Sequence, residues 1–241
     1  MRAILLAAGC GTRLQPLTNN IPKCLVPING QPLLDIWLER LSRAGIASFL
    51  VNTHYLAEKV EAYVATSRYA KHTTLVHEAA LLGTAGTLVA NVDFYEGEDG
   101  LLIHADNYCR ADIQEFLLAH ARRPPECVMT MMSFRTDTPS SCGILELDER
   151  GVVFGFHEKS ALPLGNLANG AVYLLSPELL RMMRGELSTA SDFSTEVLHR
   201  LVGRIYTYET GETFVDVGTP DSYARANATG TQRSDAPGRV A

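Results

Sequence analysis

Long apolar runs are missing from this sequence of 241 residues. No stretch reaches the 18 or so consecutive apolar residues that a membrane-spanning helix needs, so we expect no such helix and no membrane partner. The N-terminus starts directly with a strand-like segment and shows no signal-peptide pattern. We therefore expect a cytoplasmic protein.

Paired cysteines are missing as well. The sequence has five cysteines, and none of them forms a C-x-x-C pair with another. An odd, scattered set of thiols argues against both a zinc site and a disulfide framework. These residues are Cys10, Cys24, Cys109, Cys127 and Cys142.

The sequence also lacks an excess of positive charge, because 21 Lys and Arg residues face 27 Asp and Glu residues, for a net charge of −6. An acidic surface repels nucleic acid and anionic membranes, so we expect neither as a partner. A protein of this charge that binds phosphates needs a local basic pocket or a divalent cation.

The first half of the chain alternates strands and helices. Apolar segments predict strands at 2–8, 48–53, 73–77 and 101–105, and amphipathic patterns between them predict helices. This order predicts a Rossmann-like three-layer α/β/α sandwich with a mixed, mostly parallel sheet. Ligands of such folds bind at the carboxyl ends of the strands. Residues expected at that edge are Gly9, Asn52, Glu78 and Asp106.

The second half predicts additional antiparallel and mixed strands in the same sheet. We expect one hairpin around residues 148–151 and a second one, formed by 204–209 and 213–216, around Thr210-Gly211. A last helix begins at Thr219-Pro220. We expect a single domain over residues 1–228 and a flexible tail over 229–241, which is small and polar.

A glycine-rich segment follows the first predicted strand. Residues 9–14 read Gly-Cys-Gly-Thr-Arg-Leu, and Pro22-Lys23 follows soon after. Bare backbone N–H groups in such a loop can bind phosphate oxygens, and Arg13 and Lys23 can add positive charge. Leu14 excludes the dinucleotide fingerprint G-x-G-x-x-G, and no Gly-Lys-Ser/Thr follows, which excludes a Walker loop.

The chain resembles the sugar-1-phosphate nucleotidyltransferase family in several segments that occur in the family's order across residues 1–228. The resemblance implies a Mg²⁺-dependent reaction in which a sugar-1-phosphate oxygen attacks the α-phosphorus of a nucleoside triphosphate. It allows a homodimer and fixes no oligomeric state. The segments are Leu6–Leu14, Pro22–Ile28, Leu82–Gly86, Phe156–Lys159 and Phe214–Pro220.

The resemblance also assigns roles to individual residues. It implies that Arg13 stabilises the departing pyrophosphate, that Lys23 bridges the two phosphates, and that Asp106 acts in catalysis and binds the metal with Asp216. Nucleotide-binding residues implied in the same way are Ala8, Gly9, Cys10, Gly11, Thr12, Asn52, Glu78, Gly83 and Thr84. Sugar-phosphate-binding residues are Gly143, Glu158, Lys159 and Asn169.

Four positions depart from the family pattern. Ala105 stands where the family has glycine before Asp106, Ser160 replaces proline after Glu158-Lys159, and Gly170-Ala171 reverses the family's Ala-Gly. Several residues also have a structural reading that the sequence leaves open: Thr84 as a helix cap, Asn52 and Tyr55 as core residues, and Asp106 as a turn cap.

The resemblance favours transfer of GMP from GTP, for a glycoconjugate sugar of the cell surface. Uridylyl or thymidylyl transfer to a hexose-1-phosphate stays open, as does cytidylyl transfer to a non-sugar alcohol phosphate. A catalytically silent sensor of sugar nucleotides is a further alternative. Such a sensor predicts the loss of Arg13, Lys23, Asp106 or Asp216, and all four residues are present.

Overall fold

The computed structural model describes residues 1–229 and contains a nine-stranded mixed sheet. Its parallel half has β1 (Arg2–Leu6) between β4 (Phe49–Thr53) and β6 (Gly100–His104), with β5 (Thr73–His77) at the edge. The expected α/β fold is therefore confirmed. β1 ends two residues before the predicted end at residue 8, because the Ala7 N–H bonds to the Asn52 side chain instead of a strand partner.

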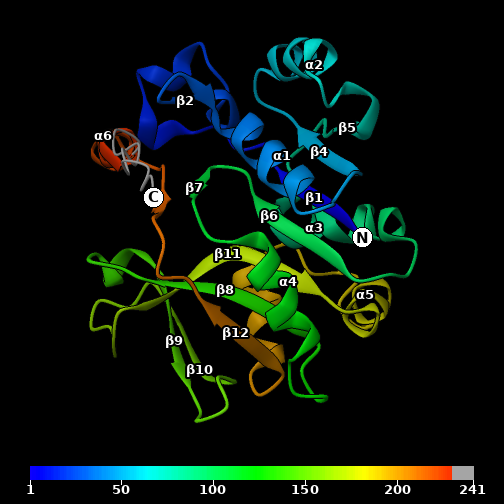
Figure 1. Cartoon of the computed structure of the whole chain (residues 1–241), viewed down its shortest axis with the longest axis vertical. Helices are drawn as coiled ribbons and strands as arrows, with labels where there is room; N and C mark the ends of the chain where they lie inside the picture. The colour runs from blue at the N-terminus through cyan, green and yellow to red at the C-terminus, as the bar shows by residue number, and fades with distance from the viewer. Residues whose placement is uncertain (230–241) are drawn as a thin grey trace, which may run out of the picture.

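Helices cover both faces of this sheet and give it three layers (Figure 1). Alternate residues of β1 point to opposite faces, so Ile4 joins one core cluster while Ala3 and Leu5 join the other. One face packs against α3 (Gly83–Ala90) and α5 (Pro177–Arg184). The other packs against α1 (Leu33–Arg43), α2 (Ala57–Thr66) and α4 (Ile113–Ala121).

The second half of the chain extends the sheet with antiparallel strands, as predicted. β11 (Leu167–Leu175) pairs antiparallel with β6 and is also antiparallel to β8 (Met129–Arg135) and β9 (Gly143–Leu147). β9 and β10 (Val153–Glu158) form the first expected hairpin. The carboxyl ends of the parallel strands therefore lie along the same edge of the sheet as the nearby ends of β9, β10 and β11.

The second expected hairpin is wrong. β12 (Ile205–Glu209) pairs parallel with β8 in the large sheet, whereas β13 (Phe214–Asp216) pairs antiparallel with β7 (Asn107–Cys109). β13 is held away from β12 because the Phe214 ring stacks on Phe134 at 4.3 Å and Thr213 O accepts the Arg110 N–H at 2.8 Å. The sequence reading did not predict β7. The two-stranded ribbon β7–β13 joins residues more than 100 positions apart.

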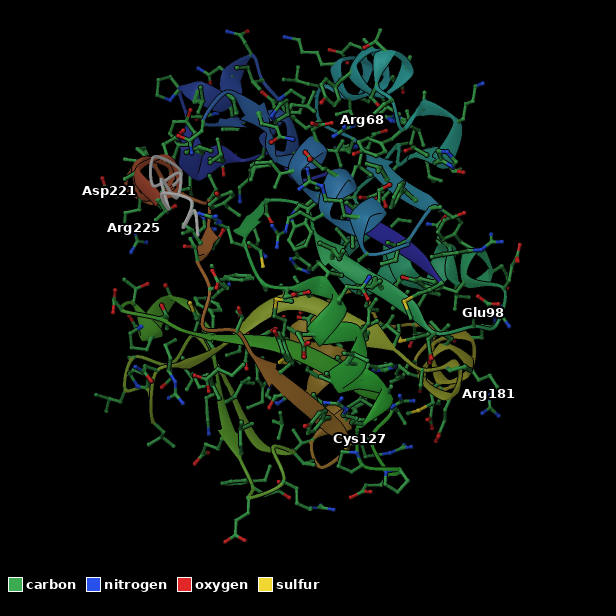
Figure 2. The ribbon with its side chains drawn as sticks, viewed as in Figure 1. Arg68, Glu98, Cys127, Arg181, Asp221 and Arg225 are labelled. Atoms are coloured by element: carbon green, nitrogen blue, oxygen red, sulfur yellow. The ribbon has the colours of Figure 1, made fainter. Side chains whose placement is uncertain are left out.

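The remaining elements lie at the periphery. The strands β2 (Pro27–Ile28) and β3 (Gln31–Pro32) form a small hairpin, and α6 (Pro220–Thr229) begins at the predicted Thr219-Pro220 step. Figure 2 shows Asp221 and Arg225 on α6 at the outer rim. Apart from Thr229, which is helical, the tail expected over 229–241 lies outside the described residues. In residues 1–229, no helix combines the length and apolar character needed to cross a membrane.

Short turns complete the chain. A π-helical turn spans Phe193–Val197. The 3-10 turns are Thr12–Leu14, Leu17–Asn19, Lys23–Leu25, Ala70–His72, Val92–Tyr95, Pro139–Ser141 and Leu198–Leu201.

Candidate active site

The loop after β1 presents unpaired backbone donors. Within residues 1–229, the N–H groups of Ala8, Gly9, Cys10 and Gly11 have no hydrogen-bond acceptor. Gly11 adopts a left-handed conformation with φ +62°, and its carbonyl accepts the Thr18 hydroxyl at 2.7 Å. A row of open N–H groups held in this way is suited to binding an anion such as a phosphate.

Lys23 lies directly behind this loop. A Cβ added to Gly11 would lie 3.2 Å from Lys23 Cβ, so the loop and the lysine are in contact. The Lys23 side chain is buried, and its Nζ lies 2.5 Å from Asp106 Oδ2 and 3.7 Å from Asp216 Oδ1. A buried ammonium needs such partners, because a charge without them is expensive to remove from water.

The ribbon β7–β13 brings the two carboxylates together. Asp106 immediately precedes β7, and Asp216 pairs with Asn107 at the end of the ribbon. Val217 N–H also donates to Asp106 O at 3.3 Å. Ala105, at the position where the family has glycine, is accommodated just before Asp106. It is fully buried, and its N–H donates to Leu6 O at 3.0 Å.

Electrostatics keep Asp106 ionised. Burial acts to raise the pKa of its carboxyl group, but the charge of Lys23, together with His104 and the Lys23 hydrogen bond, lowers that pKa below its usual value of 3.8. Burial lowers the pKa of His104. The site therefore has an ionised carboxylate beside a buried imidazole at neutral pH.

Arg13 reaches the same place from the other side. A Cβ added to Gly218 would lie 3.2 Å from Arg13 Nη2 and 3.2 Å from Asp216 Oδ1. The guanidinium and the carboxylate thus lie against one backbone position. The structure brings together the phosphate loop, Arg13, Lys23 and both aspartates.

Asp106 and Asp216 have the donor chemistry that Mg²⁺ prefers. Mg²⁺ takes oxygen ligands and is usually bound by one or two carboxylates, with waters and substrate phosphates completing its shell. The two carboxylates both lie within 4 Å of Lys23 Nζ, and their oxygens, next to open N–H groups for phosphates, are the donor set that fits this pattern. Among residues 1–229, no group of three or more His, Cys, Asp or Glu side chains gathers as a metal site.

A buried polar network lies beneath the expected base-binding stretch. Glu78 accepts hydrogen bonds from Asn52 Nδ2 at 2.9 Å, Thr87 Oγ1 at 2.6 Å and Leu82 N at 3.1 Å. Asn52 Oδ1 accepts from Ala7 N at 2.7 Å. Both side chains bond within the protein and fix the loops at the ends of β1 and β5, so direct contact of Asn52 and Glu78 with a nucleotide stays a prediction.

Gly83 and Thr84 form the start of α3. Gly83 has φ +81°, and a Cβ there would lie 2.3 Å from Ser191 O. Thr84 Oγ1 accepts the Phe193 N–H at 2.8 Å, so this hydroxyl ties α3 to residue 193 and does not cap the helix. Tyr55 donates its hydroxyl to Thr18 O at 3.0 Å and so supports the phosphate loop.

The expected sugar-binding residues gather at the ends of β9, β10 and β11. Glu158 is the cross-strand partner of Gly143, and a Cβ on Gly143 would lie 2.7 Å from Glu158 Oε2. Lys159 Nζ lies 3.4 Å from Glu158 Oε1 and is largely exposed. Glycine at 143 therefore leaves room for the carboxylate.

Asn169 holds an irregular stretch of β11. Its Oδ1 accepts the Ala171 N–H at 2.8 Å, and its Nδ2 donates to the Tyr173 hydroxyl at 2.8 Å. Ala171 has φ +51°, a conformation that favours the glycine the family has there, and a Cβ on Gly170 would lie 2.8 Å from Met132 O. The reversed pair therefore has its glycine at a position where a side chain would clash with the backbone of β8.

One side chain connects the two halves of the site. Asn107, next to Asp106, donates its Nδ2 to Gly170 O at 3.1 Å, next to Asn169. The sequence reading missed Asn107, Thr18 and Tyr173. Asn107 follows Asp106 directly, and Tyr173 ends the segment 169–173 that resembles the family, but neither position indicates its hydrogen bond. Thr18 lies outside the segments that carry the resemblance.

Comparison with known proteins confirms the resemblance over nearly all of the chain. Residues 2–233 match the family model described as nucleotidyl transferase. The chain is 31% identical over 227 residues to a Sulfolobus acidocaldarius protein named "Putative mannose-1-phosphate guanyltransferase", covering 93% of this chain and 62% of that protein. It is 32% identical over 180 residues to a glucose-1-phosphate thymidylyltransferase of Streptomyces griseus, covering 74% of this chain and 50% of that protein.

A solved structure supports the fold. HddC from Yersinia pseudotuberculosis, complexed with GMP-PN, superposes with a TM-score of 0.78 at 24% identity, covering 95% of this chain and 98% of that one. By contrast, the chain spans only about one half to three fifths of the length of the two curated relatives, from Sulfolobus acidocaldarius and Streptomyces griseus.

Proposed function

This chain belongs to the nucleotidyl transferase family, and on that premise we propose that it transfers GMP from GTP to a sugar-1-phosphate, giving a nucleotide sugar and pyrophosphate. The proposal includes Mg²⁺ as cofactor and a cytoplasmic enzyme that supplies nucleotide sugars for cell-surface polysaccharide.

A single observation carries the proposal: the buried Lys23 ammonium lies between Asp106 and Asp216, beside a loop of open N–H groups. Phosphoryl-type transfer depends on positioning and on charge neutralisation more than on covalent help from the protein. The site supplies both, and the reaction requires no nucleophilic side chain.

In the proposed reaction, an oxygen of the sugar phosphate forms a bond to the α-phosphorus as the bond to the bridging β-oxygen breaks. The bridging oxygen keeps the electron pair and leaves with pyrophosphate. The N–H groups of residues 8–11 would hold the triphosphate, Arg13 would neutralise the leaving group, and the Lys23 ammonium would neutralise charge on the two reacting phosphates. Asp106 and Asp216 would hold Mg²⁺, which would supply further charge neutralisation.

The sugar side of the site is built around Glu158, Lys159 and Asn169. The Glu158 carboxylate is partly exposed and can accept hydrogen bonds from sugar hydroxyls, while Lys159 can reach the phosphate. Asn169 retains one amide hydrogen for a ligand, since each of its polar atoms makes one bond to the protein.

A second candidate is thymidylyl transfer to a hexose-1-phosphate. It is favoured by the similarity to the Streptomyces griseus protein named for that activity. Pyrophosphate release with GTP, UTP, CTP and dTTP against several sugar-1-phosphates separates the candidates. We expect the highest kcat/KM with GTP, and turnover with only UTP or dTTP would show that the assigned base is wrong.

A further inference from the structure

A turn at residues 191–193 closes over the start of α3. Ser191 O accepts the N–H groups of Ala85 at 3.0 Å and Gly86 at 3.3 Å. Phe193 N–H donates to Thr84 Oγ1 at 2.8 Å. The first turn of α3 has orphan N–H groups that need acceptors from outside the helix, and this turn provides one. It therefore fixes the stretch expected to bind the base.

Glu196 holds that turn in place. Its Oε1 accepts the Ser191 hydroxyl at 2.7 Å and the Asp192 N–H at 3.2 Å, while its Oε2 accepts the Ser191 N–H at 3.3 Å. These bonds, led by that of the Ser191 side chain, lower the pKa of the Glu196 carboxyl group. Glu196 is therefore ionised at neutral pH and gathers three donors on one short loop.

The other end of the turn reaches the sugar side. The Phe193 ring packs against Tyr173 with ring centroids 4.8 Å apart, and the Tyr173 hydroxyl accepts the Asn169 amide at 2.8 Å. Tyr173 and Phe193 are fully buried, so packing holds this end without help from Glu196. Loss of Glu196 should then loosen the α3 end of the turn and leave the β11 end in place.

We propose that Glu196 is a positioning residue for the nucleotide: it orients the Ser191 carbonyl, which orders Gly83–Gly86 at the base-binding site. This inference rests on the proposed function. It assigns to a carboxylate outside the family's motifs the task of ordering the base-binding stretch before the nucleotide arrives. An ordered binding loop avoids the entropy cost of ordering on binding, so its loss weakens affinity.

Binding and kinetics test the proposal together. In Glu196→Ala we expect the Kd and KM for GTP to rise about tenfold, since bonds to a charged group are lost. The KM for the sugar phosphate and kcat should stay within about twofold. Glu196→Gln keeps Oε1 as an acceptor and should restore most of the affinity, with a loss of about threefold. Glu186→Ala is the control, since Glu186 is exposed and its side chain has no hydrogen bond or ion pair within the described residues.

Hydrogen exchange tests, without any nucleotide, whether Glu196 orders the start of α3. We expect the Ala85 and Gly86 amides to exchange about tenfold faster in Glu196→Ala and at the wild-type rate in Glu186→Ala. If wild-type protein binds none of the four triphosphates, the proposed function fails. If it binds GTP and Glu196→Ala binds equally well, or loses both substrates equally, this inference alone is overturned.

Discussion

At the scale of single residues, Lys23 and its two aspartates give the clearest test of the site. In Asp106→Asn we expect kcat to fall by about 10²–10³-fold or more, because the site loses a negative charge that would help to hold Mg²⁺. Triphosphate binding without metal should persist, because the open N–H groups of residues 8–11 are unchanged. Pyrophosphate release and calorimetry measure the two effects.

Asp137→Asn is the matched control for that prediction, because Asp137 is exposed and has no partner in residues 1–229. A wild-type rate in Asp106→Asn would remove Asp106 from the metal site.

Glu158 separates the two substrates. In Glu158→Ala we expect the KM for the sugar phosphate to rise about tenfold or more, through loss of charged hydrogen bonds to sugar hydroxyls, while the KM for GTP stays nearly constant. Steady-state kinetics with each substrate varied in turn gives both constants. Glu149→Ala, in the exposed turn between β9 and β10, should change neither. Equal rises in both KM values would contradict the sugar role.

At the scale of elements, the contact between α3 and Ser191 makes Gly83 a sensitive position. Alanine there must adopt φ +81° and would place Cβ 2.3 Å from Ser191 O. Gly97 has nearly the same φ, +77°, but nothing lies within 4 Å of its added Cβ. We expect Gly97→Ala to lower the free energy of unfolding by about 1–2 kcal/mol through backbone strain.

Gly83→Ala adds a clash to the same strain, so it should cost distinctly more stability and also raise the KM for GTP. Urea unfolding of the two variants isolates the clash, because the strain is common to both. Equal losses of stability would mean that the Ser191 turn gives way without cost.

Elements also show how far the sequence reading reaches. Apolar runs located β1, β4 and β6, because these strands are almost entirely buried and their pattern depends on local residues alone. The edge strand β5 was located as well, although it is only partly buried. The sequence also located β12 and β13 as strands, but it predicted the wrong pairing: they lie close in sequence, yet they pair with β8 and β7 far away. A hairpin signal at Thr210-Gly211 is local, whereas the Phe214–Phe134 stack that separates the strands is a tertiary contact.

The residues of the site also fall into those that the sequence predicted and those that it did not. Motifs located Arg13, Lys23, Asp106 and Asp216, and the structure brings them together. The network of Asn52, Glu78 and Thr87 was beyond a sequence reading, because its members come from three elements and their bonds depend on the packing of α3. Glu196 differs, because its partners Ser191 and Asp192 are local; what the sequence did not show is that the Ser191 carbonyl accepts the N–H groups of α3.

At the scale of the whole molecule, a buried histidine makes stability depend on pH. His120 is almost fully buried, with Nδ1 2.8 Å from Thr130 Oγ1. Burial lowers its pKa below the ordinary value of 6.5, against the opposing effect of Asp99. As the pH falls through about 6.5, His120 becomes protonated in the unfolded chain but stays neutral in the folded protein. The neutral, buried His120 therefore contributes its full stability above that pH, and this contribution is lost as the pH falls.

We expect the free energy of unfolding, measured in urea, to fall between pH 7 and pH 5. In His120→Gln the slope over this range should be smaller, since one group with a depressed pKa is gone. His72→Gln is the control, because His72 is exposed. An unchanged slope in His120→Gln would contradict the assignment.

The ribbon β7–β13 has a consequence for the time at which the enzyme becomes active during its synthesis. Asp106 is made early, but its partner Asp216 arrives 110 residues later, and only their pairing through Asn107 completes the charged centre. On the proposed function, we expect a ribosome-bound chain that has not yet exposed β13 to lack the second carboxylate of the site and therefore to transfer no nucleotide. Chains truncated before residue 214 should then release no pyrophosphate from a nucleoside triphosphate.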